Sequence, residues 1–271
     1  MRRRLVKGAM SAAKRLGLTK LVRALVARLP SRVSGRFESR VYALRRHAGD
    51  ATGHVAAEQL ERRLADALRL LRRRLGTHEV GDYLEFGVYA GGTMTCADRA
   101  RTTAGLEDMR LIGFDSFEGL PAEAAQINPQ RWSAGMFACS PEEAIENMRR
   151  GGVDVERVRL VKGWFDRVLT EATRREHGIE RAGVIMLDCD LYSSSRDALN
   201  FSAPAIRQAA VLVCDDWRHS GEDGQQRAVR EFLEQHGMHA EMLGHYRASG
   251  IPDGGRVFLV SRRNGHNGHG A

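Results

Sequence analysis

The chain has 271 residues, of which 42% are hydrophobic and 28% charged, and its net charge is +8. This length suffices for one large domain or two small ones, and the composition is typical of globular proteins. No apolar run approaches the roughly 20 residues of a membrane-spanning helix, which excludes an integral membrane protein. The four cysteines are scattered and form no CxxC pair, which excludes a zinc finger and predicts reduced thiols in a cytoplasmic protein.

The positive charge is concentrated in an N-terminal arm. The first 36 residues carry 11 basic side chains and no acidic one, so the rest of the chain has a net charge of −3. Leucines and valines between Leu18 and Leu29 recur at helical spacing, which predicts an amphipathic helix. We expect this helix to pack on the globular body or on a second subunit, and a membrane-surface helix is the alternative. The predicted boundaries are a basic helical arm over 1–50, a globular domain over 51–263 and a disordered tail over 264–271.

After a predicted leucine-rich helix over Val55–Leu75, short apolar runs alternate with helical patterns. This alternation is typical of βαβ units and of a parallel sheet covered on both faces. The predicted strands are Tyr83–Val88, Leu111–Ser116, Val158–Gly163, Gly183–Asp190 and Ala210–Trp217. The predicted helices are Thr93–Thr102, Pro141–Arg150, Asp166–Glu176, Ser193–Gln208 and Gly224–His236. His239–Tyr246 and Val257–Ser261 are predicted as an antiparallel edge pair.

The stretch from Phe117 to Ser140 lacks clean periodicity and contains two prolines and several aromatic residues. A long irregular segment at the carboxyl edge of a parallel sheet is more often a lid or substrate loop than a plain connection. We therefore expect a lid between Ala122 and Ala138.

The first two predicted strands end in a pattern that suits an adenosine cofactor. Glycines after the first strand let the backbone approach a ligand, although their spacing is not GxGxxG. Glu85, just before Gly87, suits a cationic ligand and opposes a pyrophosphate. Asp115 ends the second strand, where Rossmann-like folds place the carboxylate that binds ribose, and an N-cap is the alternative. Trp164, after the third strand, either covers an adenine or belongs to the core.

Acidic residues stand at the carboxyl ends of the fourth and fifth predicted strands. Asp188 and Asp190 come after one apolar run, and Asp215 and Asp216 after the next. Because the carboxyl ends of neighbouring parallel strands meet at one edge, these carboxylates are expected to converge and repel one another. A divalent cation would relieve the repulsion, and oxygen-only ligands favour Mg²⁺, Ca²⁺ or Mn²⁺ over zinc. The alternative is that the acids cap helices or pair with nearby arginines.

Five strings in order between residues 82 and 237 resemble one family: YLEFGVYAGGTM, GFDSFEGLP, KGWFDRVL, MLDCDLYSS and VCDDW. They are similar to the macrocin O-methyltransferase (TylF-like) family. The resemblance implies a class I methyltransferase fold, an α/β Rossmann-like sheet that is mostly parallel with an antiparallel C-terminal edge. It also implies S-adenosylmethionine and Mg²⁺ as cofactors. Members methylate hydroxyl groups, commonly of sugars on natural products.

Carried onto this sequence, the resemblance implies a specific set of site residues. The implied S-adenosylmethionine contacts are Glu85, Gly87, Thr93, Asp115, Ser116, Glu118 and Trp164. The implied Mg²⁺ ligands are Asp188, Asp215 and Asp216, with Asp188 also the base that deprotonates the acceptor hydroxyl.

We expect the partner to be a small, glycosylated acceptor and not a nucleic acid. We also expect a homo-oligomer, with contact between the basic arm and a membrane surface as a further possibility. Three alternatives stay open from the sequence. A catechol-like acceptor would chelate Mg²⁺ equally well, and a NAD-dependent oxidoreductase could use a similar sheet. The third is a nucleic-acid- or membrane-binding protein that uses the basic arm, with the sheet as its scaffold.

Overall fold

The computed structural model describes residues 57–127, 132–218, 222–248 and 251–262. The chain divides into two compact units, Met1–Leu44 with Glu118–Ala138, and Arg45–Phe117 with Cys139–Ala271. The predicted arm helix between Leu18 and Leu29 and the predicted tail over 264–271 lie outside the described residues. Among the described helices, none is both long and apolar enough to cross a membrane.

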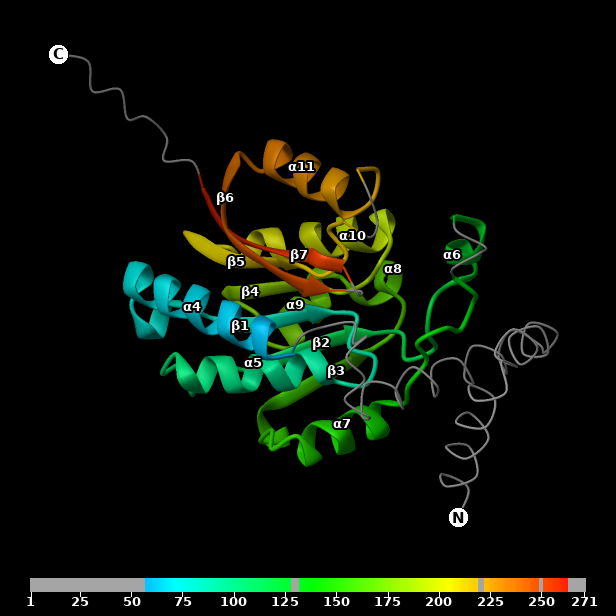
Figure 1. Cartoon of the computed structure of the whole chain (residues 1–271), viewed down its shortest axis with the longest axis horizontal. Helices are drawn as coiled ribbons and strands as arrows, with labels where there is room; N and C mark the ends of the chain where they lie inside the picture. Colours follow the sequence, from blue (N-terminus) through cyan, green and yellow to red (C-terminus); the bar gives the residue numbers. More distant parts are fainter. Residues whose placement is uncertain (1–56, 128–131, 219–221, 249–250, 263–271) are drawn as a thin grey trace. The chain divides into compact units, whose positions relative to one another are not determined.

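The larger unit is built on a seven-stranded sheet with the order β3-β2-β1-β4-β5-β7-β6 (Figure 1). The first five strands pair in parallel, and β7 pairs antiparallel with both β5 and β6. The strands are β1 (Asp82–Phe86), β2 (Leu111–Asp115), β3 (Val158–Lys162), β4 (Ala182–Leu187), β5 (Ala209–Cys214), β6 (Met238–Ala248) and β7 (Ile251–Arg262). This arrangement confirms the predicted α/β class, mostly parallel with an antiparallel C-terminal edge.

Helices cover both faces of this sheet, as Figure 1 shows. Because successive strand side chains point to opposite faces, Val211 and Val213 join one core cluster, and Leu212 and Cys214 join the other. The first cluster packs against α4 (Ala57–Leu75), α5 (Gly92–Thr103) and α7 (Pro141–Arg150). The second packs against α10 (Tyr192–Ser202) and α11 (Gln225–Gln235). Strands buried on both faces explain the continuous apolar runs in the sequence.

Two predicted helices are shorter or broken in the structure. In place of one helix over Asp166–Glu176 there are α8 (Phe165–Val168) and α9 (Glu171–Glu176). Thr170 separates them, because its side chain accepts the backbone N–H of Thr173 and starts α9 as an N-cap. The helix predicted to reach Gln208 ends at Ser202. Short 3₁₀ turns occupy Thr77–Glu79, Val155–Arg157 and Ala203–Ala205.

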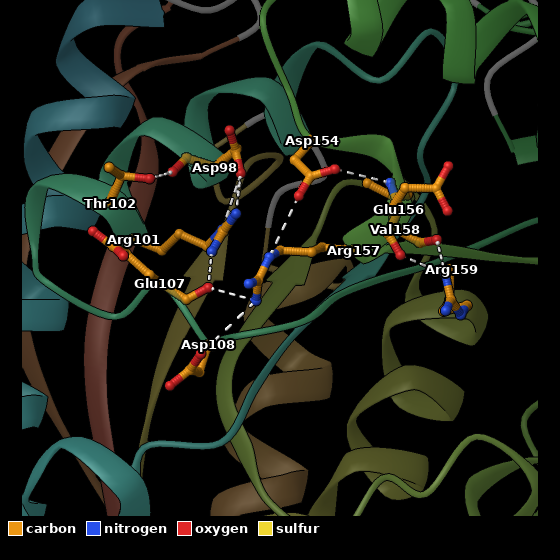
Figure 2. Close-up of polar contacts among 10 residues, drawn as sticks. All are labelled: Asp98, Arg101, Thr102, Glu107, Asp108, Asp154, Glu156, Arg157, Val158 and Arg159. Carbon is orange, nitrogen blue, oxygen red and sulfur yellow. Dashed lines mark hydrogen bonds and ion pairs between the residues drawn. The ribbon is translucent and has the colours of Figure 1, made fainter.

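The amino edge of the sheet is fixed by arginines (Figure 2). Arg101, buried near the end of α5, donates from Nε and Nη2 to Asp98 Oδ1 at 2.9 and 2.6 Å. Arg101 and Arg157 both donate to the backbone carbonyl of Glu107, just before β2. Charge-assisted hydrogen bonds of this kind are stronger than neutral ones. They hold the start of β2 against α5 and β3, at the edge opposite the carboxyl ends of the parallel strands.

The segment Glu118–Ala138, part of the smaller unit, is not wholly irregular. It contains a helix, α6 (Ala122–Ile127). Leu120 donates its backbone N–H to the carbonyl of Met136 at 2.7 Å, and Gly135 donates to the carbonyl of Leu120 at 2.8 Å. These two bonds bring the ends of the segment together. Its function as a lid stays a prediction.

Candidate active site

The backbone ladder of the sheet continues one residue past three strands at its carboxyl edge. Gly87 donates its N–H to Phe114, Asp188 to Phe86, and Asp215 to Leu187, each at 2.9 Å. The order of the strands reverses between β1 and β4, which is where open α/β sheets bind ligands. The residues that follow β1, β4 and β5 are therefore held in fixed positions at the expected ligand site.

Asp188, Asp215 and Asp216 meet at this edge and are called the acid cluster below. Each offers one carboxylate oxygen, and these three oxygens lie within 4.8 Å of one another. Asp215 and Asp216 are 3% and 2% exposed, whereas Asp188 is half-buried. Three converging carboxylates repel one another strongly in a buried site, and a hard divalent cation with oxygen ligands offsets that repulsion. The donor set therefore fits Mg²⁺, as the sequence predicted for these residues.

Two side chains that the sequence did not single out support the acid cluster. The Tyr246 hydroxyl donates to Asp215 Oδ1 at 2.6 Å. Gln225 accepts the Asp216 backbone N–H at 3.1 Å and donates from Nε2 to Asp216 Oδ2 at 3.4 Å. Burial and the neighbouring Asp215 carboxylate raise the pKa of Tyr246 well above its ordinary value, so the hydroxyl keeps its proton.

The sequence does contain a signal that Gln225 is buried. On α11 it shares a helical face with Ala228, Val229 and Phe232, all buried. A glutamine on an apolar stripe indicates a buried polar contact. Tyr246 has no comparable signal, because its acceptor is 31 residues away in the chain.

Glu85 and Thr93, both predicted to contact the cofactor, hydrogen-bond each other. The Thr93 hydroxyl donates to Glu85 Oε1 at 2.6 Å, and the Tyr83 hydroxyl donates to Glu85 Oε2. Glu85 has no exposed surface in this structure. Burial and the adjacent carboxylate raise the pKa of Tyr83, which keeps this hydroxyl a donor. The observed contacts fix α5 to β1, and a cofactor contact for these residues stays a prediction.

Asp115 organises the loop after β1. Its Oδ2 accepts the backbone N–H groups of Val88 and Tyr89, both at 2.8 Å, and its Oδ1 accepts that of Phe117 at 2.7 Å. Burial raises the pKa of Asp115, while these three hydrogen bonds favour its ionised form. Asp115 therefore shapes the predicted cofactor loop. The predicted contact with ribose is not tested by this arrangement. Ser116, next to it, is buried.

The cysteines offer no nucleophile at this edge. All four are free, and Cys189 lies between Asp188 and Asp190. Burial raises the pKa of Cys139 to about 12, and burial also raises the pKa of Cys189 and Cys214. Thiols with such pKa values stay protonated at neutral pH, so they are poor nucleophiles.

Comparison with known proteins assigns the family. The macrocin-O-methyltransferase (TylF) family model matches residues 13–245. The chain belongs to the macrocin-O-methyltransferase (TylF) family. The match confirms the family resemblance of the five strings, and it does not favour the oxidoreductase alternative.

One relative of this TylF-family chain is the 8-demethyl-8-(2,3-dimethoxy-alpha-L-rhamnosyl)-tetracenomycin-C 4'-O-methyltransferase of Streptomyces olivaceus. It is 29% identical over 164 residues, which are 58% of this chain and 60% of that protein. The chain matches about 60 to 64% of the length of the curated relatives.

Two solved structures share the fold of the TylF-family chain. The O-methyltransferase NovP has a TM-score of 0.58 at 24% identity, covering 74% of this chain and 80% of that chain. TomG of Streptomyces achromogenes, solved in complex with S-adenosylmethionine, has a TM-score of 0.52 at 18% identity, covering 83% and 90%. These matches confirm the predicted class I methyltransferase fold.

Two remaining predicted contacts of the TylF-family site lie in different units. Trp164 is half-buried at the carboxyl end of β3, where it precedes α8. Glu118 is exposed and begins the segment of the smaller unit. The structure therefore places Trp164 at the carboxyl edge of the sheet, whereas a role for Glu118 at that edge stays a prediction.

Replacing Asp115 with asparagine is expected to lower the free energy of unfolding by about 1–3 kcal/mol, because the new NH₂ group faces a backbone N–H donor. Affinity for S-adenosylhomocysteine is expected to fall with it, since the loop at Val88 and Tyr89 loses its acceptor. Denaturant unfolding and calorimetric titration measure the two effects. Asp154→Asn is the control, because Asp154 caps one N–H at 3.2 Å on the surface. Equal behaviour of the two variants would contradict the proposed role of Asp115.

Proposed function

We propose that this chain is an S-adenosylmethionine-dependent, Mg²⁺-assisted O-methyltransferase that methylates a hydroxyl of a sugar or of a glycosylated natural product. The single observation that carries the proposal is the acid cluster at the carboxyl edge of the sheet, where Gly87 of the turn over residues 87–92, called the glycine turn, lies against the backbone of Asp188. Membership in the TylF family supports the reaction type. The named relative, which acts on a rhamnosyl group, supports the choice of a sugar acceptor.

The acid cluster supplies the two functions that this chemistry requires of the protein. Asp188, Asp215 and Asp216 would hold Mg²⁺. When bound, S-adenosylmethionine supplies an electrophilic methyl group, and Mg²⁺ lowers the pKa of the acceptor hydroxyl. Asp188 is the half-buried member of the cluster, whereas Asp215 and Asp216 are buried, so its carboxylate would take the hydroxyl proton as general base. Tyr246 and Gln225 keep the other two carboxylates in place.

The loop residues at the ends of β1 and β2 would bind and orient the methyl donor. The glycine turn brings the backbone close to the ligand, and Asp115 fixes the N–H groups of that turn. Glu85 would supply negative charge near a cationic donor, and the hydrogen bond from Thr93 fixes the orientation of its carboxylate. Trp164 offers an aromatic surface for adenine. Rate would then depend largely on positioning the acceptor oxygen in line with the methyl group.

The test of the proposal uses the purified full chain. Calorimetric titration with S-adenosylhomocysteine, with NAD as the comparison, is expected to show binding of the former alone. Nucleotide-activated sugars, rhamnosides and catechols are then offered as acceptors with S-adenosylmethionine, and S-adenosylhomocysteine release is measured. Methylation of catechols alone would replace the sugar assignment by the catechol alternative. Absence of S-adenosylhomocysteine binding would contradict the methyltransferase proposal itself.

Removing divalent metal is expected to abolish methyl transfer. Without the cation, the negative charge of the acid cluster disfavours the negatively charged oxygen that the acceptor hydroxyl must become. Turnover is measured after treatment with EDTA and dialysis, and again after addition of MgCl₂. Full recovery with Mg²⁺ is the expected result, with CaCl₂ and MnCl₂ as comparisons that define the preferred ion. Unchanged turnover after complete chelation would contradict the metal assignment.

A cytoplasmic location, a homo-oligomeric state and contact of the basic arm with an anionic membrane stay predictions of the sequence. The arm lies outside the described residues, so it is tested by deletion. Vesicle binding that is lost when residues 1–36 are removed would support the membrane contact.

A further inference from the structure

We propose that Tyr246 is a positioning residue of the acid cluster, whose hydroxyl fixes the carboxylate of Asp215, and that Gly255 leaves the space its ring requires. The inference rests on the proposed metal-assisted function and assigns a function to the antiparallel end of the sheet. Neither the family strings nor the acid pattern of the sequence includes either residue.

The contact between Tyr246 and Asp215 is buried and short. The two residues are 1% and 3% exposed, and the hydroxyl donates to Asp215 Oδ1 at 2.6 Å. Hydrogen bonds to an ionised acceptor are shorter and stronger than neutral ones, and they fix the orientation of the carboxylate plane. Groups that orient metal ligands in this way commonly control metal affinity. The position of Asp215 in the acid cluster therefore depends on a residue outside it.

The path of the tyrosine ring explains why residue 255 is glycine. Tyr246 lies on β6, whereas Asp215 directly follows β5, and β7 lies between these two strands. Tyr246 pairs with Gly255 of β7, and the next residue of β7, Arg256, pairs with Cys214 of β5. A Cβ on Gly255 would lie 2.5 Å from Tyr246 Cε1 and 2.8 Å from its hydroxyl oxygen. The ring of Tyr246 therefore crosses β7 over Gly255, which has no side chain.

The other buried member of the acid cluster is held in a parallel way. Asp216 Oδ2 accepts the backbone N–H of Asp190 at 3.0 Å and the Gln225 side chain at 3.4 Å. Each buried acid thus has a donor from an element that follows β5. Separate hydrogen bonds to these two adjacent carboxylates indicate that the geometry of the cluster is fixed before a cation binds. Such preorganisation lowers the free-energy cost of ordering the ligands when the cation binds.

Tyr246→Phe in the full chain tests the inference, because it removes the hydroxyl and keeps the ring. The dissociation constant for Mg²⁺, measured by calorimetry without donor or acceptor, is expected to rise about 10- to 100-fold. Affinity for S-adenosylhomocysteine is expected to stay unchanged. Gly255→Ala is expected to weaken Mg²⁺ binding in the same direction, because the ring must move while its hydroxyl is retained.

Tyr83→Phe is the matched control. Tyr83 is also a buried tyrosine whose hydroxyl donates to a buried carboxylate, but that acceptor is Glu85, outside the acid cluster. Its Mg²⁺ affinity is expected to equal that of the wild type. Wild-type affinity in both Tyr246→Phe and Gly255→Ala would overturn the inference and leave the proposed function intact. An equal loss in Tyr83→Phe would overturn it as well. Absence of Mg²⁺ binding by the wild type would overturn the metal assignment and this inference together.

Discussion

Replacing Asp188 with asparagine is expected to reduce kcat by about 100- to 10,000-fold, the range that a general base contributes. Asparagine keeps the size of the side chain but can neither accept the hydroxyl proton nor provide a charged metal ligand. Asp188 is also the half-buried member of the acid cluster, so we expect its carboxylate to be the one that an acceptor reaches. Turnover is measured at saturating Mg²⁺, S-adenosylmethionine and acceptor.

Stability is expected to respond in the opposite direction to activity. Without Mg²⁺, removing one of three adjacent negative charges lowers repulsion, so the Tm of Asp188→Asn is expected to equal or exceed that of the wild type. With Mg²⁺ present, the wild type is expected to gain more in Tm than the variant, because a ligand that binds only the folded state stabilises it. Thermal unfolding with and without MgCl₂ measures both effects.

Asp197→Asn is the control for the change in charge. Asp197 lies on α10, outside the acid cluster, and pairs with Arg196 at 2.8 Å. Its replacement also removes one negative charge and is expected to leave kcat unchanged. Near-wild-type turnover of Asp188→Asn would show that the proton goes to another group, and the assignment of Asp188 as base would be wrong.

The fold was predictable because the central strands are apolar on both faces. All residues of β4 and β5 are buried, so each strand is visible as an uninterrupted apolar run. The predicted ends were too late, however: β4 ends at Leu187 and β5 at Cys214, directly before the acids. The backbone ladder continues only one residue further, to Asp188 and Asp215. Apolar periodicity does not show where a strand gives way to the acids of the site.

The antiparallel edge was predicted in kind but not in length. β6 begins at Met238 and β7 at Ile251, so both strands are longer than the apolar pattern indicated. Half-exposed strands alternate polar and apolar residues, and glycines such as Gly255 interrupt the pattern further. The glycine that weakened the strand signal is the residue that accommodates Tyr246.

The convergence of the acid cluster followed from topology alone, since neighbouring parallel strands end at one edge. The hydrogen-bond partners of the acid cluster could not be predicted in this way, because Tyr246 reaches Asp215 only through the pairing of β5, β7 and β6. Glu85 illustrates the same limit. Its position before the glycine turn predicts a ligand contact, but the sequence did not show that Glu85 accepts hydrogen bonds from Tyr83 and Thr93. Position along a strand is predictable from sequence, but the partner of a buried polar side chain depends on packing.

Gly87→Ala is expected to lower the free energy of unfolding by about 3 kcal/mol or more, from left-handed backbone strain and overpacking of about 1–3 kcal/mol each. Gly87 has φ +96°. A Cβ there would overlap the carbonyl oxygen of Asp188 and lie 2.7 Å from its carbonyl carbon. These atoms belong to the backbone, so no rotamer change relieves the overlap. Asp188 must shift, and we expect Mg²⁺ affinity and kcat to fall together.

Gly152→Ala separates the two causes. Gly152 has φ +89°, and a Cβ there would meet nothing within 4 Å, so its replacement adds backbone strain without a clash. Denaturant unfolding of both variants therefore isolates the cost of the contact with Asp188. The greater destabilisation of Gly87→Ala is expected to be accompanied by weaker Mg²⁺ binding. Gly152→Ala is expected to bind Mg²⁺ as tightly as the wild type. Equal stability and equal Mg²⁺ affinity in the two variants would show that Gly87 does not position Asp188, and that the glycine serves only the turn.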